Sequence, residues 1–221
     1  FEVGKNMDEE QAARIQSGSD AVFVAGGTWN SLRLGVPGEG ARGVHYALDY
    51  LRRVNSGEKP SLGKRVIVIG GGSVALDAAR TARRTGAEEV HLVCLETRDL
   101  TSWDRMPALD QEIMEAEEEG ITMHPSLGIR EITVADGRFT GIETRKCVSV
   151  REPDGRFNPQ YDTASPSPAL QGDSLIIAIG QAAEPSPFAP GSGVFVGGDM
   201  VEGPSQVIQA VASARKAVRE I

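Results

Sequence analysis

The stretch Arg-Val-Ile-Val-Ile-Gly-Gly-Gly-Ser-Val-Ala-Leu-Asp, residues 65–77, joins an apolar run to three consecutive glycines. The apolar run predicts a buried strand over 65–69. Apolar residues at helical spacing then predict a helix from Ser73 to about Thr85, and Gly86 ends it. A strand, a glycine turn and a helix in direct succession form the context in which a Gly-x-Gly-x-x-Ala pattern indicates a dinucleotide site.

Each small residue of this pattern has a physical reason. Gly70 allows a tight turn, Gly72 leaves backbone uncovered where a pyrophosphate would lie, and Ala75 lets the helix pack closely on the strand. Backbone N–H groups and the positive end of the helix dipole would then hold the anion. The alternative is a glycine turn with a purely structural role. The residues that we expect to contact the pyrophosphate are Gly70, Gly71, Gly72, Ser73 and Val74.

The end of the next predicted strand, 89–95, bears on the choice between NAD and NADP. An acidic residue there accepts a hydrogen bond from a ribose 2′-hydroxyl, whereas arginine accommodates a 2′-phosphate. Glu96 lies 24 residues after Gly72 and is the candidate for the ribose, which favours NADH. Arg98, two residues on, could instead bind a phosphate. The alternative is that Glu96 is an ordinary surface residue.

The remaining pattern predicts an α/β chain. Strand, helix and strand over 65–95 form a βαβ unit, which implies parallel strands and a right-handed crossover. Alternation over 129–134 and 139–150, with a turn at Asp136-Gly137, predicts an antiparallel meander. The other predicted elements are strands at 20–26, 173–179 and 193–196, helices at 44–54, 107–119 and 204–220, and a polar loop at 158–168.

Composition excludes several classes of protein. The 221 residues carry a net charge of −8 and show no basic run, which argues against a nucleic-acid partner. No apolar stretch is long enough to span a membrane, and no signal-peptide pattern opens the chain. Cys94 and Cys147 form no Cys-x-x-Cys motif, so a reducing, cytoplasmic compartment is expected. A chain that opens at Phe1 suggests a fragment of a longer protein.

The sequence predicts neither a catalytic side chain nor a metal site. The three histidines are scattered, and no Ser/His/Asp or Cys/His arrangement stands out. Asp199 follows Val-Phe-Val-Gly-Gly and precedes a predicted helix, so its carboxylate could hold polyol hydroxyl groups. A helix-capping role for Asp199 is the alternative.

Five segments in order resemble the FAD/NAD(P)-dependent pyridine nucleotide-disulfide oxidoreductase superfamily, and within it the small (beta) subunit of glutamate synthase. The segment Met106-Pro107-Ala108, before an acidic helix that ends at Gly120, favours that branch. The five segments are 20–28, 35–38, 70–77, 173–181 and 193–199.

The resemblance implies two nested nucleotide domains. A Rossmann-like, three-layer NAD(P) domain with its antiparallel meander, residues 43–174, would be inserted in a partial FAD domain, residues 1–42 and 175–221. Hydride would pass from NAD(P)H to FAD, and electrons would continue to an iron–sulfur or flavin partner subunit. By this resemblance Gly180 and Gln181 would lie near the nicotinamide. The residues near FAD would be Gly26, Gly27, Thr28, Gly198, Asp199, Gln206 and Val207.

The sequence also departs from the family. The glycine loop that grips the FAD phosphates and the iron–sulfur cysteines of the branch are both missing, and residues 185–193 are shorter than expected. NADPH-using relatives often have two arginines where Leu95 and Glu96 stand. Without a Cys-x-x-Cys motif, disulfide reduction is excluded for this chain. The alternative function is therefore a non-catalytic NAD(H)-binding module.

Overall fold

The computed structural model describes residues 1–162, 164–189, 191 and 193–221. The chain divides into two compact units. The larger unit is Ser31–Ile179, and the smaller one combines Phe1–Asn30 with Gly180–Ile221. The two-residue strands β2 (Asn30–Ser31) and β12 (Gln181–Ala182) lie where the chain passes between the two units.

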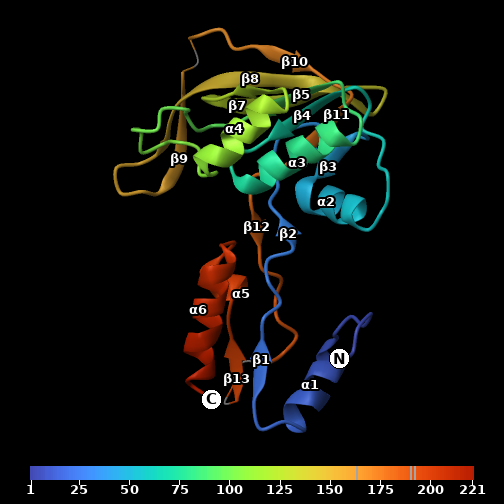
Figure 1. The fold of residues 1–221 in the computed structure, drawn as a ribbon, viewed down its shortest axis with the longest axis vertical. Coiled ribbons are helices and arrows are strands. Elements are labelled where there is room, and N and C mark those ends of the chain that lie inside the picture. Colours follow the sequence, from blue (N-terminus) through green and yellow to red (C-terminus); the bar gives the residue numbers. More distant parts are fainter. Residues whose placement is uncertain (163, 190, 192) are drawn as a thin grey trace. The chain divides into compact units, whose positions relative to one another are not determined.

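A five-stranded parallel sheet forms the centre of the larger unit, in the order β3-β11-β4-β5-β6. Helices cover one face, and an antiparallel sheet covers the other (Figure 1). The predicted α/β, three-layer arrangement is thereby confirmed. The strands are β3 (Val44–Tyr46), β11 (Ser174–Ile177), β4 (Arg65–Ile69), β5 (Glu89–Val93) and β6 (Ile121–His124). The helices are α2 (Ala47–Asn55), α3 (Ser73–Arg84) and α4 (Asp110–Glu118).

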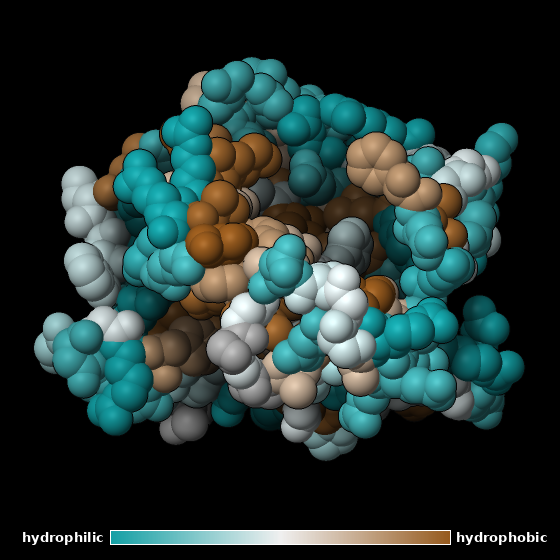
Figure 2. Space-filling view, turned by 90° about the horizontal axis from the view of Figure 1, so that it is seen from below, coloured by the Kyte–Doolittle hydropathy of each residue, from teal (hydrophilic) through white to brown (hydrophobic). Residues whose placement is uncertain are grey.

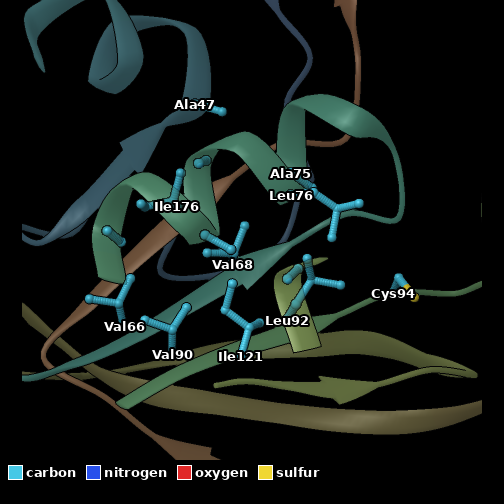
Figure 3. Close-up of a cluster of buried hydrophobic side chains, with 14 of the residues drawn as sticks. Ala47, Val66, Val68, Ala75, Leu76, Val90, Leu92, Cys94, Ile121 and Ile176 are labelled. Atoms are coloured by element: carbon cyan, nitrogen blue, oxygen red, sulfur yellow. The ribbon is translucent and has the colours of Figure 1, made fainter. Parts of the chain in front are cut away.

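Side-chain alternation along β4 explains why its sequence is apolar throughout. Val66 and Val68 pack among the helices, in the cluster of Figure 3, whereas Ile67 and Ile69 pack against the antiparallel sheet. All four residues are at most 5% exposed. A strand whose two faces are both covered needs apolar residues at every position, which is typical of parallel sheets.

The antiparallel sheet has the order β10-β8-β7, and β9 also pairs with β8. The turn between β7 and β8 is Asp136-Gly137, with φ of 51° and 72°, as the sequence predicts. The prediction of a loop over 158–168 is wrong in its first part, because β9 pairs with β8 there. Pro159 is compatible with this strand because β9 lies at an edge. Residue 163 of the predicted loop lies outside the described residues. The strands are β7 (Leu127–Ala135), β8 (Arg138–Arg151), β9 (Phe157–Asp162) and β10 (Ala169–Gln171).

Three other predictions need correction. The segment 44–54 begins as strand β3, paired with β11, and turns helical only at Ala47. Helix α4 begins at Asp110 instead of Pro107, and the helix predicted at 204–220 spans only Val207–Val218. The sequence reading also missed strand β6, whose four residues follow Gly120 directly.

The smaller unit contains a two-stranded parallel sheet, in which β1 (Val22–Val24) pairs with β13 (Val194–Val196). Its helices are α1 (Glu9–Ser17), α5 (Asp199–Glu202) and α6 (Val207–Val218). Helix α1, which the sequence reading missed, is capped by the Asp8 side chain. Many apolar side chains of this unit are exposed, among them Val201, Val207 and Ile208. Figure 2 shows one face of the molecule, on which hydrophobic and hydrophilic residues are mixed. Within the described part of the chain, every helix is too short or too polar to cross a bilayer.

Candidate functional site

The glycine loop lies between β4 and α3, at the edge of the parallel sheet where its strands end. Gly70 has a φ of +138°, and a Cβ there would lie 2.2 Å from the Ala178 carbonyl oxygen. The Gly70 N–H donates to the Val93 carbonyl at 2.9 Å, which ties the loop to β5. Only glycine fits this turn without displacing backbone.

Four backbone N–H groups of the loop are available to a ligand. Those of Gly71, Gly72, Ser73 and Val74 have no acceptor among the described residues. They stand at the first turn of α3, where helical N–H groups lack partners and the helix dipole is positive. Gly72 has an unstrained backbone, and a Cβ there would meet only the Pro107 Cγ at 3.9 Å. Glycine at this position is therefore not required by the fold, which points to a ligand that approaches the backbone.

Glu96 lies directly against this loop. Its Oε2 atom is 2.6 Å from the position that a Cβ of Gly71 would take. Burial raises the pKa of Glu96, and the positive charge of Arg151 opposes that rise. The structure thus brings together the glycine loop and the acidic residue that the sequence assigned to a ribose. Arg98 is instead engaged with α4, because it donates to Glu117 at 3.0 Å.

Neither cysteine is poised for redox chemistry. Burial raises the pKa of the Cys94 thiol to about 12, and the Glu96 charge adds to the rise. Burial also raises the pKa of Cys147, helped by the Asp104 carboxylate. Both thiols are therefore protonated at neutral pH, and a thiol is a poor nucleophile compared with a thiolate.

Sequence reasoning missed Glu112, a residue of α4 that touches the loop. One carboxylate oxygen of Glu112 accepts a hydrogen bond from the Ser73 hydroxyl at 2.7 Å. The Ala108 N–H donates to the Gly71 carbonyl at 3.3 Å. In the sequence, Met106-Pro107-Ala108 pointed only to a branch of the family. It did not predict that this segment contacts the glycine loop.

The smaller unit gathers several of its predicted residues at one end of its sheet. Gly26, Gly27 and Thr28 follow β1, while Gly198 and Asp199 follow β13, its parallel neighbour. The Gly26 N–H lies 2.9 Å from the Met200 sulfur, one residue after Asp199. Asp199 accepts a hydrogen bond from the Ser205 hydroxyl at 2.7 Å.

The other predicted residues of the smaller unit are at element ends. Gln206 is the N-terminal cap residue of α6, without a side-chain capping bond, and Val207 is 82% exposed. Gly180 has a φ of +121°, and Gln181 begins β12. Their contacts with a nicotinamide or a flavin stay a prediction.

Comparison with known proteins supports the resemblance drawn from the motifs. The chain is 37% identical to the NADP(+)-dependent formate dehydrogenase subunit beta of Moorella thermoacetica, over 99% of this chain and 33% of that protein. It is 34% identical to the glutamate synthase [NADPH] small chain of Halomonas elongata, over 98% of this chain and 51% of that one. The chain thus spans about a third to a half of the length of these relatives.

Solved structures show the same fold. FprA from Mycobacterium tuberculosis in complex with NADPH matches with a TM-score of 0.77 at 18% identity, over 96% of this chain and 65% of that one. Residues 3–190 match the family model described as pyridine nucleotide-disulphide oxidoreductase. This chain therefore belongs to the pyridine nucleotide-disulphide oxidoreductase family.

Proposed function

We propose that this chain is the NAD(P)H-binding part of a flavin-dependent oxidoreductase. The larger unit would bind the dinucleotide, and the smaller unit would form part of an FAD domain. The observation that carries the proposal is the glycine loop at the carboxyl end of β4, whose four N–H groups have no acceptor among the described residues. Family membership supports the reaction class.

The residues of the larger unit fit a dinucleotide. The N–H groups of Gly71, Gly72, Ser73 and Val74 would donate to the pyrophosphate, and the dipole of α3 would stabilise its negative charge. Bound NAD(P)H supplies a hydride to FAD, a step that requires no acid or base from the protein. The task of the chain is then to bind and orient the two cofactors.

Relatives named as beta or small subunits support an electron-accepting partner, which we expect to be an iron–sulfur or flavin subunit in the cytoplasm. In the smaller unit, the Asp199 carboxylate, three residues after β13, would hold the polyol chain of FAD.

For the dinucleotide we propose NADH, although the relatives named above carry NADP or NADPH in their names. Glu96 follows β5, and its carboxylate lies against the glycine loop, where we expect the adenosine ribose. Its carboxylate would accept from the 2′-hydroxyl and repel a 2′-phosphate. Arg98 is paired with Glu117 and would have to leave that partner to bind a phosphate.

A non-catalytic NAD(H)-binding module is the second candidate. It is favoured by the two-stranded sheet and the exposed apolar residues of the smaller unit. The visible absorbance spectrum after incubation with FAD and desalting separates the two candidates. A retained flavin band that NADH bleaches supports the oxidoreductase, and loss of the flavin supports the module.

The substitution Gly72→Val tests the loop assignment. We expect the dissociation constant for NADH to rise about 100-fold, since hydrogen bonds to charged groups contribute about 1.5–3 kcal/mol each. The measurement is a titration of nicotinamide fluorescence, with circular dichroism to verify folding. Gly40→Val is the matched control, because a Cβ at exposed Gly40 meets nothing within 4 Å. Undiminished affinity in a folded Gly72→Val protein would refute the assignment.

The substitution Glu96→Arg tests the choice of dinucleotide. It removes a repulsive carboxylate and adds a donor for the 2′-phosphate, so the NADPH to NADH affinity ratio should rise at least about 10-fold. The same titration measures both affinities. Adding Arg98→Gln shows whether Arg98 contributes to phosphate binding. A ratio that does not move would mean that Glu96 does not contact the ribose.

A further inference from the structure

The segment 106–112 lies against the glycine loop and contacts it at several points. The Met106 N–H donates to the Thr97 carbonyl at 3.1 Å, and the Ala108 N–H donates to the Gly71 carbonyl at 3.3 Å. Pro107 is the nearest neighbour of the side-chain position at Gly72, at 3.9 Å. The segment therefore flanks the part of the loop that carries the free N–H groups.

Glu112 connects the beginnings of two helices through one oxygen atom. Its Oε2 accepts from the Ser73 hydroxyl at 2.7 Å and from the Leu109 N–H at 3.0 Å. Ser73 is the first residue of α3, and Leu109 precedes the first residue of α4. Leu109 has no polar side chain to accept from the first-turn N–H groups of α4. Glu112 supplies the reciprocal half of a capping box by accepting from the Leu109 N–H, and the same oxygen contacts the start of α3.

This contact also decides what Ser73 can offer to a ligand. A hydroxyl group has one proton to donate, and here that proton points to Glu112. The Ser73 side chain is thus held by the protein, while the Ser73 N–H stays free.

The carboxylate has a second effect, which is electrostatic. Glu112 adds a negative charge at the positive end of α3, where an anion would bind. Asp77, one turn along α3, faces the same charge, and its pKa is raised by burial and by Glu112 while Arg80 and Arg84 oppose the rise. A charged Glu112 therefore fixes the loop but weakens its attraction for an anion.

We infer that Glu112 is a positioning residue for dinucleotide binding, which holds Ser73 so that the neighbouring N–H groups converge on the pyrophosphate. The inference rests on the proposed function. It predicts opposite results for two substitutions at the same position, because alanine removes both the contact and the charge whereas glutamine removes only the charge.

The experiment compares Glu112→Ala, Glu112→Gln and Ser73→Ala by NADH titration. We expect the dissociation constant to rise about 10-fold for Glu112→Ala. Glutamine keeps an acceptor oxygen, so Glu112→Gln should bind as tightly as the wild type or more tightly. Ser73→Ala should weaken binding, and the double variant with Glu112→Ala should be no weaker than the worse single variant.

Glu115→Ala is the matched control, since Glu115 lies on the same helix and pairs with Arg80 of α3 at 3.0 Å, one turn farther from the loop. It should lower the melting temperature without changing the NADH affinity. If Glu115→Ala and Glu112→Ala weakened NADH binding equally, Glu112 would act only through the packing of α4, and the inference would be wrong. Unchanged affinity in Glu112→Ala would also overturn the inference.

A measurement without nucleotide separates this inference from the proposed function. Hydrogen exchange at Ala75 and Leu76, whose N–H groups donate to the Gly72 carbonyl at 2.9 and 3.2 Å, should become faster in Glu112→Ala and stay unchanged in Glu112→Gln and Glu115→Ala. If the wild type binds neither NADH nor NADPH, the proposed function fails, while the exchange rates still show whether Glu112 holds the start of α3. Unchanged exchange in Glu112→Ala would overturn the positioning role.

Discussion

Each unit of this chain leads a parallel strand through glycines into a helix, but the two junctions differ in what supports them. In the larger unit, β4 is buried from Val66 to Ile69, and α3 buries five of its twelve residues. In the smaller unit, β13 and the helix after its glycines, α5, have no buried residue, and the next helix, α6, buries only Ala217. The same local pattern of strand, glycine and helix is thus held by packing in one unit and mainly by local bonds in the other.

This difference teaches what makes a glycine loop a binding site. Its N–H groups hold an anion well only if they are fixed before the ligand arrives, because ordering a loop on binding costs conformational entropy. Two packed faces fix the loop after β4. At the loop after β13, the Gly198 N–H already donates to the Ser213 hydroxyl at 3.1 Å. We therefore place the stronger nucleotide affinity in the larger unit.

The largest effect should come from the core. Leu92 is fully buried in the larger unit, and Leu92→Ala should lower the free energy of unfolding by about 3 kcal/mol. Val207 is 82% exposed in the smaller unit, so Val207→Ala should change it by less than about 0.5 kcal/mol. Urea unfolding followed by circular dichroism measures both. Equal losses would contradict the contrast between the units.

A glycine in each unit gives a sharper comparison. Gly70 and Gly198 both have positive φ, but a Cβ at Gly70 would lie 2.2 Å from the Ala178 carbonyl oxygen, whereas nothing lies within 4 Å at Gly198. Gly198→Ala should cost about 1 kcal/mol through backbone strain alone, and Gly70→Ala about 2 kcal/mol or more. Urea unfolding of the two variants isolates the cost of the close contact. Equal costs would mean that the Ala178 carbonyl, just after β11, moves away from the added Cβ without a cost in free energy.

Local sequence patterns predicted the structure correctly where they favour the same conformation as the packing. The run 65–69, the glycines after it and the alternation around Asp136-Gly137 each specify one structure, and the structure has all three. Glu96 was singled out because a carboxylate at the end of the second strand can accept from a ribose hydroxyl, a role that stays a prediction. Its contact with Gly71 is tertiary, yet the parallel order of β4 and β5 makes it predictable.

Local sequence patterns did not predict the structure where pairing with a distant segment decides the secondary structure. Val44 fits a helix by its spacing, but pairing with Leu175 makes it part of β3. The polar segment 157–162 is a strand because β8 offers it an edge, which no local pattern announces. The contact of Glu112 could not be predicted, since its partner Ser73 is 39 residues away in the sequence.

The smallest expected effect concerns Asp173, whose Oδ2 accepts from the N–H groups of Lys64 and Arg65 at 2.8 and 2.9 Å. These bonds join the start of β4 to the segment before β11, and they lower the pKa of Asp173 against an opposing effect of burial. Because the folded-state pKa lies below that of the unfolded chain, the stabilisation is present above about pH 4 and is lost as the pH falls through the folded-state pKa. The carboxylate is 40% exposed, so solvent screening limits the loss in Asp173→Asn to about 1 kcal/mol at pH 7.

The pH dependence of unfolding decides whether this bond acts through its charge. The difference between wild type and Asp173→Asn should shrink as the pH falls from 5 toward 2, because protonation removes the same charge from the wild type. Asp199→Asn in the smaller unit is the comparison, since its carboxylate accepts from the Ser205 hydroxyl and not from strand N–H groups. It should change the free energy of unfolding by less than about 0.5 kcal/mol at either pH. A constant difference between wild type and Asp173→Asn across this range would mean that the carboxylate holds β4 by shape alone, and that charge contributes nothing to this end of the sheet.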